Sequence, residues 1–260
     1  MLTLEQIKQS YLKKNVSLKS SLVEYLQCEI LDSLFKQKGS EKLSFMGGTA
    51  IRIVYEGNRF SEDLDFDNFG ISFPEFEDIL KKVVLDMKLK GFFLEFRLVE
   101  KGAYHSYIKF PQILKKAGIS QLKDEKILIR IDTVKKEKIF LPENFLLNKF
   151  DVYRTILVSP LPVILSQKLL TALERKREKG RDFYDVNFLW GRTNPDFSYL
   201  KKVSGLEKKE FIRIFLEKCQ KLDFNSLAKD VEPFLINPEQ IERVKGFLRF
   251  IQEKSENIDP

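Results

Sequence analysis

Three aspartates, Asp63, Asp65 and Asp67, alternate with other residues in the stretch SEDLDFD. In an extended strand, side chains two residues apart point to the same face and lie about 6 to 7 Å from each other. Carboxylates at that spacing repel one another by about 2 to 3 kcal/mol at an effective dielectric constant of about 20, unless a cation lies between them. The pattern therefore predicts either a solvated strand face or a site for metal ions.

A glycine pair followed by a hydroxyl residue, Gly47, Gly48 and Thr49, precedes these aspartates and leads into an expected helix over residues 49–55. Glycines allow backbone N–H groups to approach a phosphate, and a helix N-terminus adds the positive end of its dipole. Taken alone, the glycine pair fits a tight turn and the aspartates fit a solvated edge strand. Their conjunction favours a site for a nucleoside triphosphate and its metal ions, with Asp67 solvated.

The hydrophobic pattern predicts an α+β protein with a mixed sheet in an N-terminal lobe, residues 1–142, and a helical lobe, residues 143–260, that completes the active site. Helices are expected over residues 3–14, 18–37 and 72–89, the last with a capping box at Ser72. Strands are expected over residues 92–99, 104–110 and 126–134, and one amphipathic helix after Asn237. In the third of these strands, Arg130 and Asp132 face away from the isoleucines.

Charge and composition limit the kinds of partner and site. The chain carries a net charge of +7, with ten basic and four acidic side chains in residues 101–140, and six and two in residues 168–181. Such patches suit a polyanion or are simply solvated. The single histidine argues against a histidine-based zinc site, so any metal would be held by oxygen, which favours Mg²⁺, Mn²⁺ or Ca²⁺.

The same composition predicts a cytoplasmic protein. Cys28 and Cys219 show no pairing pattern, and the first ten residues lack the apolar core of a signal peptide. The uncharged stretch of residues 155–167 is too short to span a bilayer, which takes about 20 residues.

The order strand, Gly-Gly, Thr, helix and Asp-x-Asp strand resembles the DNA polymerase β-like nucleotidyltransferase superfamily. More narrowly, GGTA with RFSEDLDF, and the later block QKLLTALERKREKGRDFYDVNFL, resemble the AbiEii/AbiGii toxin family of toxin–antitoxin and phage-defence systems. The resemblance implies an enzyme that moves a nucleotide from an NTP to an acceptor. Several members of that family act on tRNA 3′ ends, so it also implies a tRNA acceptor and a cognate antitoxin protein.

Residue by residue, the resemblance implies contacts to the NTP from Gly47, Gly48, Thr49, Arg59, Ser61, Lys168, Arg175, Asp182 and Asp185. It implies that Asp63 and Asp65 hold two Mg²⁺ ions, with Mn²⁺ as a substitute. Asp132 is the candidate for a third carboxylate, acting as metal ligand or general base, with Glu95 as the fallback. Asp63, Asp65, Asp132 and Lys168 would then carry the chemistry, in which Lys168 offsets charge on the triphosphate.

Several of these residues also have structural explanations. Asp132 fits a salt bridge with Arg130 as well as it fits a metal site, and His105 fits a structural role better than a catalytic one. Lys168 alone fits a solvated helix, Asp182 fits a helix cap, and Asp185 fits an i,i+4 partner of Arg181.

Two other functions remain open from the sequence. The same chemistry fits a small-molecule or protein hydroxyl as acceptor, and the same binding groups fit a nucleotide- or RNA-binding module without turnover. The basic surface favours RNA.

Overall fold

The computed structural model describes residues 2–11, 16–122 and 125–256, and the chain forms two compact units. Unit 1 comprises Met1–Glu56, Phe60–Lys138 and Pro142–Val158, and unit 2 comprises Gly57–Arg59, Ile139–Leu141 and Ser159–Pro260.

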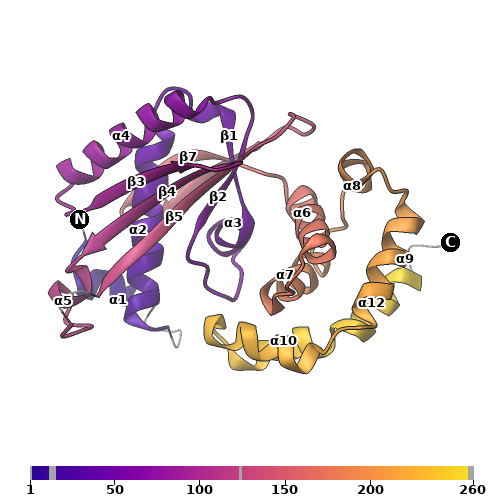
Figure 1. Cartoon of the computed structure of the whole chain (residues 1–260). Coiled ribbons are helices and arrows are strands. Elements are labelled where there is room, and N and C mark those ends of the chain that lie inside the picture. Colours follow the sequence, from indigo (N-terminus) through magenta and orange to yellow (C-terminus); the bar gives the residue numbers. More distant parts are fainter. Residues whose placement is uncertain (1, 12–15, 123–124, 257–260) are drawn as a thin grey trace. The chain divides into compact units, whose positions relative to one another are not determined.

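The described strands form one mixed sheet in unit 1, in the order β3-β4-β5-β2-β1-β7-β6 (Figure 1). β2 and β5 are parallel, as are β1 and β7, and the other neighbours are antiparallel. The strands are β1 (Leu43–Met46), β2 (Leu64–Asn68), β3 (Glu95–Glu100), β4 (Tyr104–Pro111), β5 (Lys126–Lys135), β6 (Glu143–Lys149) and β7 (Val152–Val158). The predicted α+β class with a mixed sheet is confirmed.

Five α-helices belong to the described part of unit 1: α1 (Leu4–Gln9), α2 (Leu18–Phe35), α3 (Gly47–Ile53), α4 (Phe73–Leu89) and α5 (Ile113–Lys116). A short 3₁₀ helix, η1 (Ser40–Lys42), precedes β1. The capping box predicted at Ser72 is present, because Ser72 accepts from the Glu75 backbone N–H while the Glu75 side chain accepts from that of Ser72. It begins α4 at the expected place.

The sheet has one buried and one more exposed face along β5. Ile127, Ile129 and Ile131 are buried, whereas Leu128 is 45% exposed and Arg130 is partly exposed. This is the alternation that the sequence predicts, because successive strand residues point to opposite faces. α2 packs against β5, β7 and α4.

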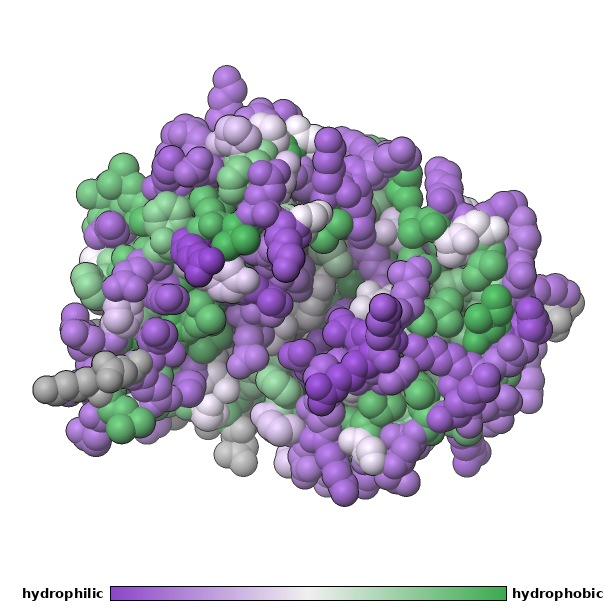
Figure 2. Space-filling model, in the orientation of Figure 1, coloured by the Kyte–Doolittle hydropathy of each residue, from purple (hydrophilic) through white to green (hydrophobic). Residues whose placement is uncertain are grey.

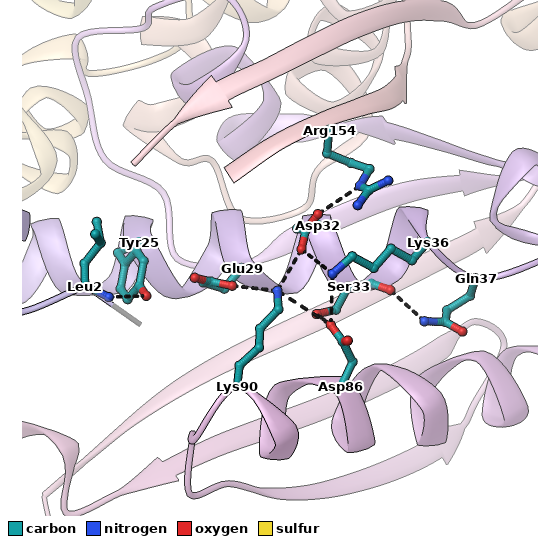
Figure 3. A network of polar contacts seen from close by, with 10 residues as sticks. All are labelled: Leu2, Tyr25, Glu29, Asp32, Ser33, Lys36, Gln37, Asp86, Lys90 and Arg154. Carbon is teal, nitrogen blue, oxygen red and sulfur yellow. Dashed lines mark hydrogen bonds and ion pairs between the residues drawn. The ribbon is translucent and has the colours of Figure 1, made fainter. Parts of the chain in front are cut away.

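α2 and α4 are joined by a network of ion pairs that Figure 3 shows. Lys90 Nζ lies 2.7 Å from both Glu29 and Asp32, and Arg154 Nε, from β7, lies 2.8 Å from Asp32. Lys36 and Asp86 complete this set of six residues, here called the α2 network. Because the network ties both helices to the sheet, it stabilises the framework that carries the strands.

The prediction that residues after 143 are helical is wrong for residues 143–158, which form β6 and β7 and belong to unit 1. β6 is an edge strand in which only Leu147 is buried, so it shows little of the alternation that marks a strand. β7 pairs with β6 on one side and with β1 on the other.

The helices of unit 2 pack around aromatic side chains. They are α6 (Leu161–Glu174), α7 (Gly180–Trp190), α8 (Phe197–Ser204), α9 (Lys208–Cys219), α10 (Phe224–Val231), α11 (Glu242–Lys245) and α12 (Phe247–Glu256), with 3₁₀ helices η2 (Glu232–Phe234) and η3 (Pro238–Ile241). Phe183, Phe224 and Phe247 pack with ring centroids 5.1 to 5.4 Å apart. Asn237 caps its segment as predicted, but the expected single helix is divided because α11 ends at Gly246.

Within the described residues, no helix is long and apolar enough to cross a membrane. The face seen in Figure 2 is mostly hydrophilic, with hydrophobic side chains in separate patches. Both cysteines are buried and free.

Candidate active site

The sheet places two carboxylates side by side in the centre of unit 1. In the parallel pair of β2 and β5, Asp65 is in register with Asp132, so the two side chains leave adjacent strands on the same face. Asp63 directly precedes β2. We call Asp63, Asp65 and Asp132 the sheet carboxylates. The structure therefore places Asp132, the candidate third carboxylate, on the strand next to the Asp-x-Asp segment.

Arg130 lies among the sheet carboxylates. One of its terminal nitrogens (Nη2) donates to Asp63 Oδ2 at 2.8 Å, and its Nε lies 2.9 Å from Asp132 Oδ2. Partial burial alone would lower the pKa of Arg130, but the charges of Asp63 and Asp132 raise it above its ordinary value. The sequence suggested a salt bridge between Arg130 and Asp132 as the alternative to a metal site. The structure contains this salt bridge, and Asp132 still lies beside Asp65.

His105 holds the other oxygen of Asp132. It is in register with Asp132 across β4 and β5, and its Nδ1 lies 2.8 Å from Asp132 Oδ1. Asp132 is therefore held from both sides, by His105 and by Arg130. This contact gives the single histidine a place beside a candidate site residue, in contrast to the remote structural role that its isolated position in the sequence suggests.

Gly47 meets Asp65 at the start of α3. Its φ is +78°, a conformation that favours glycine, and a Cβ at this position would lie 2.3 Å from Asp65 Oδ2. Gly47 and Gly48 form the first two residues of α3, where the sequence predicted a turn ahead of the helix. The backbone at the helix N-terminus can approach Asp65 because no side chain separates them.

Thr49 has a different position from the one its predicted role requires. Its side chain is fully buried, and its hydroxyl donates to the backbone carbonyl of Asp63. The Thr49 side chain therefore ties α3 to the segment that carries the aspartates, and in this geometry its hydroxyl is not presented to a phosphate.

Ser61, Asp67 and Glu95 have other surroundings. The backbone carbonyl of Ser61 accepts a hydrogen bond from Gln27, and Glu95 lies on edge strand β3 opposite Lys109. The prediction that Asp67 is solvated is wrong, because Asp67 is fully buried and pairs with Lys136 at 2.9 Å.

The sheet carboxylates have the donor chemistry of a magnesium site. Mg²⁺ prefers oxygen ligands, usually one or two carboxylates together with substrate phosphates, and adjacent carboxylates gain from a cation that neutralises them. Within the described residues, no three acidic, histidine or cysteine side chains converge tightly enough to form a ready-made metal cluster. Carboxylates that bind a metal ion only together with phosphate oxygens are consistent with both observations.

The other predicted residues form a cluster in unit 2 whose two aspartates are buried. Arg59 forms a bidentate ion pair with Asp185, in which Nε donates to Oδ1 at 2.6 Å and Nη2 donates to Oδ2 at 2.5 Å. Lys168 Nζ lies 2.8 Å from Asp185 Oδ2 and 3.5 Å from Asp182 Oδ1, and Arg175 Nε lies 3.0 Å from Asp182 Oδ2. These five residues are called the Asp185 network.

Asp185 is the centre of that network. Complete burial alone would raise its pKa, but the charges of Arg59 and Lys168 outweigh this effect and hold the pKa below its usual value. Asp182 is in the first turn of α7 and makes no N-cap hydrogen bond, and Asp185 pairs with Arg59 and Lys168. The alternatives of a helix cap and of an i,i+4 pair with Arg181 are therefore wrong; the Arg181 guanidinium instead lies over the Phe234 ring.

The sequence analysis did not predict that Arg130 and His105 would both engage the sheet carboxylates. The sequence carried a partial signal, since each residue lies at an outward position of an alternating strand. Their convergence on Asp132 depends on the register of β4 with β5, which strand patterns alone do not fix.

Three comparisons place this arrangement among known proteins. A sequence model of the family described as "Nucleotidyl transferase AbiEii toxin, Type IV TA system" matches residues 29–255. A search of curated protein sequences finds no match. The remaining comparison, with solved structures, finds similar folds at low sequence identity.

One similar structure is a candidate nucleotidyltransferase from H. pylori, with a TM-score of 0.61 and 18% identity over 94% of this chain and 100% of that chain. JHP933 from Helicobacter pylori gives a TM-score of 0.58 and 16% identity over 94% and 96%. MenT4, a nucleotidyltransferase toxin from Mycobacterium tuberculosis H37Rv, gives 0.59 and 16% over 99% and 93%. At these identities the likeness shows a shared fold.

Proposed function

Because the chain belongs to the nucleotidyl transferase AbiEii toxin family of type IV toxin–antitoxin systems, we propose that it transfers a nucleotide from an NTP to RNA in a Mg²⁺-dependent reaction. Membership of this family shows that the chain is a nucleotidyltransferase and a toxin component. The proposal adds the 3′ end of tRNA as acceptor, a cytoplasmic setting, a part in phage defence and restraint by a cognate antitoxin.

The observation that carries the proposal is the register of Asp65 with Asp132 beside the glycine-led start of α3. Two carboxylates on adjacent strands concentrate negative charge on one face, while Gly47 keeps the neighbouring backbone free of a side chain. A metal–triphosphate complex complements both features, since it brings cations for the carboxylates and phosphate oxygens for backbone N–H groups.

In the proposed reaction, the acceptor hydroxyl oxygen forms a bond to the α-phosphorus while the bond from that phosphorus to the bridging oxygen of pyrophosphate breaks. Asp63, Asp65 and Asp132 would hold the metal ions, which supply charge neutralisation at the phosphates and lower the pKa of the acceptor hydroxyl. Asp132 takes up the hydroxyl proton, and pyrophosphate leaves with the electron pair of the broken bond. His105 and Arg130 orient the Asp132 carboxylate for this step.

The Asp185 network supplies a second part of the proposal. Lys168 is held by Asp185 and Asp182, both buried, so its ammonium is fixed in place with little rotamer freedom left to lose. The proposed role of Lys168 is to offset charge on the triphosphate. Arg59 and Arg175 hold the two aspartates that position it.

A transfer assay tests the proposal. Purified protein is incubated with Mg²⁺, total tRNA and each α-labelled NTP in turn, beside an Asp63→Ala/Asp65→Ala variant and an Asp78→Asn control. Asp78 is an exposed acid on α4 that pairs with Lys82, so the control also removes a carboxylate from unit 1. The expected result is label on tRNA with wild type and control, and a loss of about 10³-fold or more in the double variant.

The assay also separates the alternatives. If label appears on a small molecule or on protein and none on RNA, the nucleotide-transfer chemistry stands but the acceptor is not RNA. NTP binding without transfer to any acceptor would contradict the proposed function. Equal transfer by wild type and the double variant would remove the sheet carboxylates from the mechanism.

A further inference from the structure

The outward-facing positions of β3, β4 and β5 form an open face that continues from the sheet carboxylates. The strand registers arrange it in rows, and the first row runs from His105 through Asp132 to Asp65. The next row runs from Arg97 on β3 through Tyr107 on β4 to Arg130 on β5. Neighbouring residues in a row lie about 5 Å apart and side chains on one strand about 6 to 7 Å apart, so Tyr107 is a near neighbour of the candidate active site.

Three cations on this face make no ion pair with any described residue, whereas Arg130, on the same face, pairs with Asp63 and Asp132. Within the described residues, no hydrogen bond or ion pair engages the side chain of Arg97, Lys109 or Lys126. In the α2 network, by contrast, Lys90 contacts three acids within 4 Å. Arg97 and Lys126 are exposed, and Lys109 is partly exposed. The uncompensated charge of these three side chains suits a ligand with several phosphates.

The same face offers a side chain for stacking. Tyr107 is partly exposed, and in the described structure it makes neither a ring contact nor a hydrogen bond. Its register partners on both sides are arginines. In the following row Leu128 is 45% exposed and lies in register with Lys109. Aromatic and apolar surface interleaved with unpaired cations is the chemistry that binds unstacked bases and their phosphates.

The length and direction of the face favour single-stranded RNA as its ligand. From Asp132 to Lys126, strand β5 extends about 20 Å at ~3.3 Å per residue. One end of this length holds the candidate general base and the other holds cations, so a chain that places its terminal hydroxyl at Asp132 would lay its preceding phosphates along the face. Glu95, on edge strand β3, lies in register with Lys109 and is the acid at that end of the face.

We propose that the open face of β3, β4 and β5 binds the single-stranded 3′ end of the RNA acceptor. In this arrangement a base stacks on Tyr107, while Arg97 and Lys109 contact phosphates. The inference rests on the proposed function, because it takes RNA as the acceptor. It adds the surface that the acceptor uses and the residues that hold it.

A binding measurement tests the surface separately from the chemistry. The anisotropy of a short, 5′-labelled single-stranded RNA is titrated with the full chain between about 50 and 200 mM KCl, without NTP. Tyr107→Ala should weaken binding about tenfold, and Tyr107→Phe should restore it, because stacking requires the ring. Arg97→Gln and Lys109→Gln should each reduce the slope of log K against log salt by about 0.7.

Two controls lie outside the open face. Lys88→Gln removes an exposed cation from α4, and Tyr153→Ala removes an aromatic side chain, 69% exposed, from β7. Neither should change RNA affinity or its salt dependence. A blunt duplex of the same sequence should bind more weakly than the single strand, because its bases are not available to stack.

The outcomes keep the two proposals apart. If wild type labels tRNA but Tyr107→Ala and Arg97→Gln bind RNA as wild type does, the inference is overturned and the proposed function stands. If wild type labels no RNA but these variants lose single-strand affinity, the surface stands and the proposed acceptor chemistry fails. Binding of RNA that is equally weak for wild type and all variants would overturn the inference as well.

Discussion

Unit 1 contains two clusters of acids and bases that differ in how exposed their side chains are. In the α2 network, Asp32 is contacted by Lys36, Lys90 and Arg154, all within 2.8 Å, and its side chain is 11% exposed. Among the sheet carboxylates, Arg130 contacts Asp63 and Asp132, and the side chains of Asp63 and Arg130 are 38% and 41% exposed. Asp63 and Arg130 are therefore more exposed than the side chains of the α2 network, which are at most 33% exposed.

The comparison shows how similar residue types serve two purposes. In the α2 network, cations pair with both oxygens of the mostly buried Asp32 and leave neither for another partner. These pairs hold α2, α4 and β7 together. Partial compensation at an accessible place leaves electrostatic free energy that a bound cation can recover. Charge matching and exposure together, more than the number of acids, distinguish a framework from a candidate active site.

Gly47→Ala tests whether the cluster of sheet carboxylates depends on close backbone approach, and it should have the largest effect. The new Cβ would lie 2.3 Å from Asp65 Oδ2, so Asp65 must move or α3 must shift. We expect nucleotide transfer to fall about 10²-fold, the cost of misplacing a reacting group by about 1 Å. Transfer rates and thermal unfolding are measured for the same preparations.

Gly102→Ala is the matched control, because Gly102 has a φ of +69° and open space around its Cβ position. It imposes a similar backbone strain on unit 1 away from the sheet carboxylates. Equal losses of transfer in both variants would attribute the effect to strain and would remove the contact with Asp65 from the explanation.

The difference between the two clusters also explains what the sequence could predict. Gly47, Asp63 and Asp65 lie in one short segment whose spacing and order carry the signal, so local reasoning finds them. Asp132 was identified because it lies at an outward position of a strongly alternating strand. The contacts of His105 and Arg130 with it depend on strand register, and the buried Asp67 pairs with Lys136, which is distant in the chain; neither is a local property.

The second unit gives the same lesson. The Lys168 and Asp182 side chains come from adjacent helices, so their pairing follows from helix spacing and a short connection. The partner of Asp185 is Arg59, 126 positions away in the chain, and no periodicity reports that contact. The sequence therefore identified the members of the Asp185 network, and the structure supplied their pairing.

Asp32→Asn tests the compensated cluster, and its effect should appear in stability. Burial alone would raise the pKa of Asp32, but hydrogen bonds from Lys36, Lys90 and Arg154 lower it to about 2 from an ordinary 3.8. A lowered pKa stabilises the folded protein above the ordinary value, and this contribution is lost as pH falls through about 2. We expect the variant to be less stable by about 2 kcal/mol at neutral pH.

Urea unfolding of wild type and Asp32→Asn at a series of pH values measures this difference. The gap in unfolding free energy should be constant near neutral pH and should close between pH 3.8 and about 2. Transfer per folded molecule should remain unchanged. The exposed pair of Asp78 with Lys82 provides the control, because Asp78→Asn should change stability by less than about 1 kcal/mol. A pH-independent gap would show that shape, and not charge, accounts for the loss.

Arg130→Gln removes a positive charge from the sheet carboxylates and should produce the smallest of these effects. Arg130 contacts two of the carboxylates proposed to hold metal, so a divalent ion must compete with its guanidinium for their oxygens. Removing the charge should strengthen Mn²⁺ binding about tenfold, equivalent to 1.4 kcal/mol, as measured by the loss of the free-ion electron paramagnetic resonance signal. Arg97→Gln, which removes a charge from the same face without contacting a carboxylate, should leave Mn²⁺ affinity nearly unchanged. Weaker Mn²⁺ binding by Arg130→Gln would mean that the guanidinium assembles the carboxylates for the ion, and the contrast drawn between the two clusters would then need a different cause.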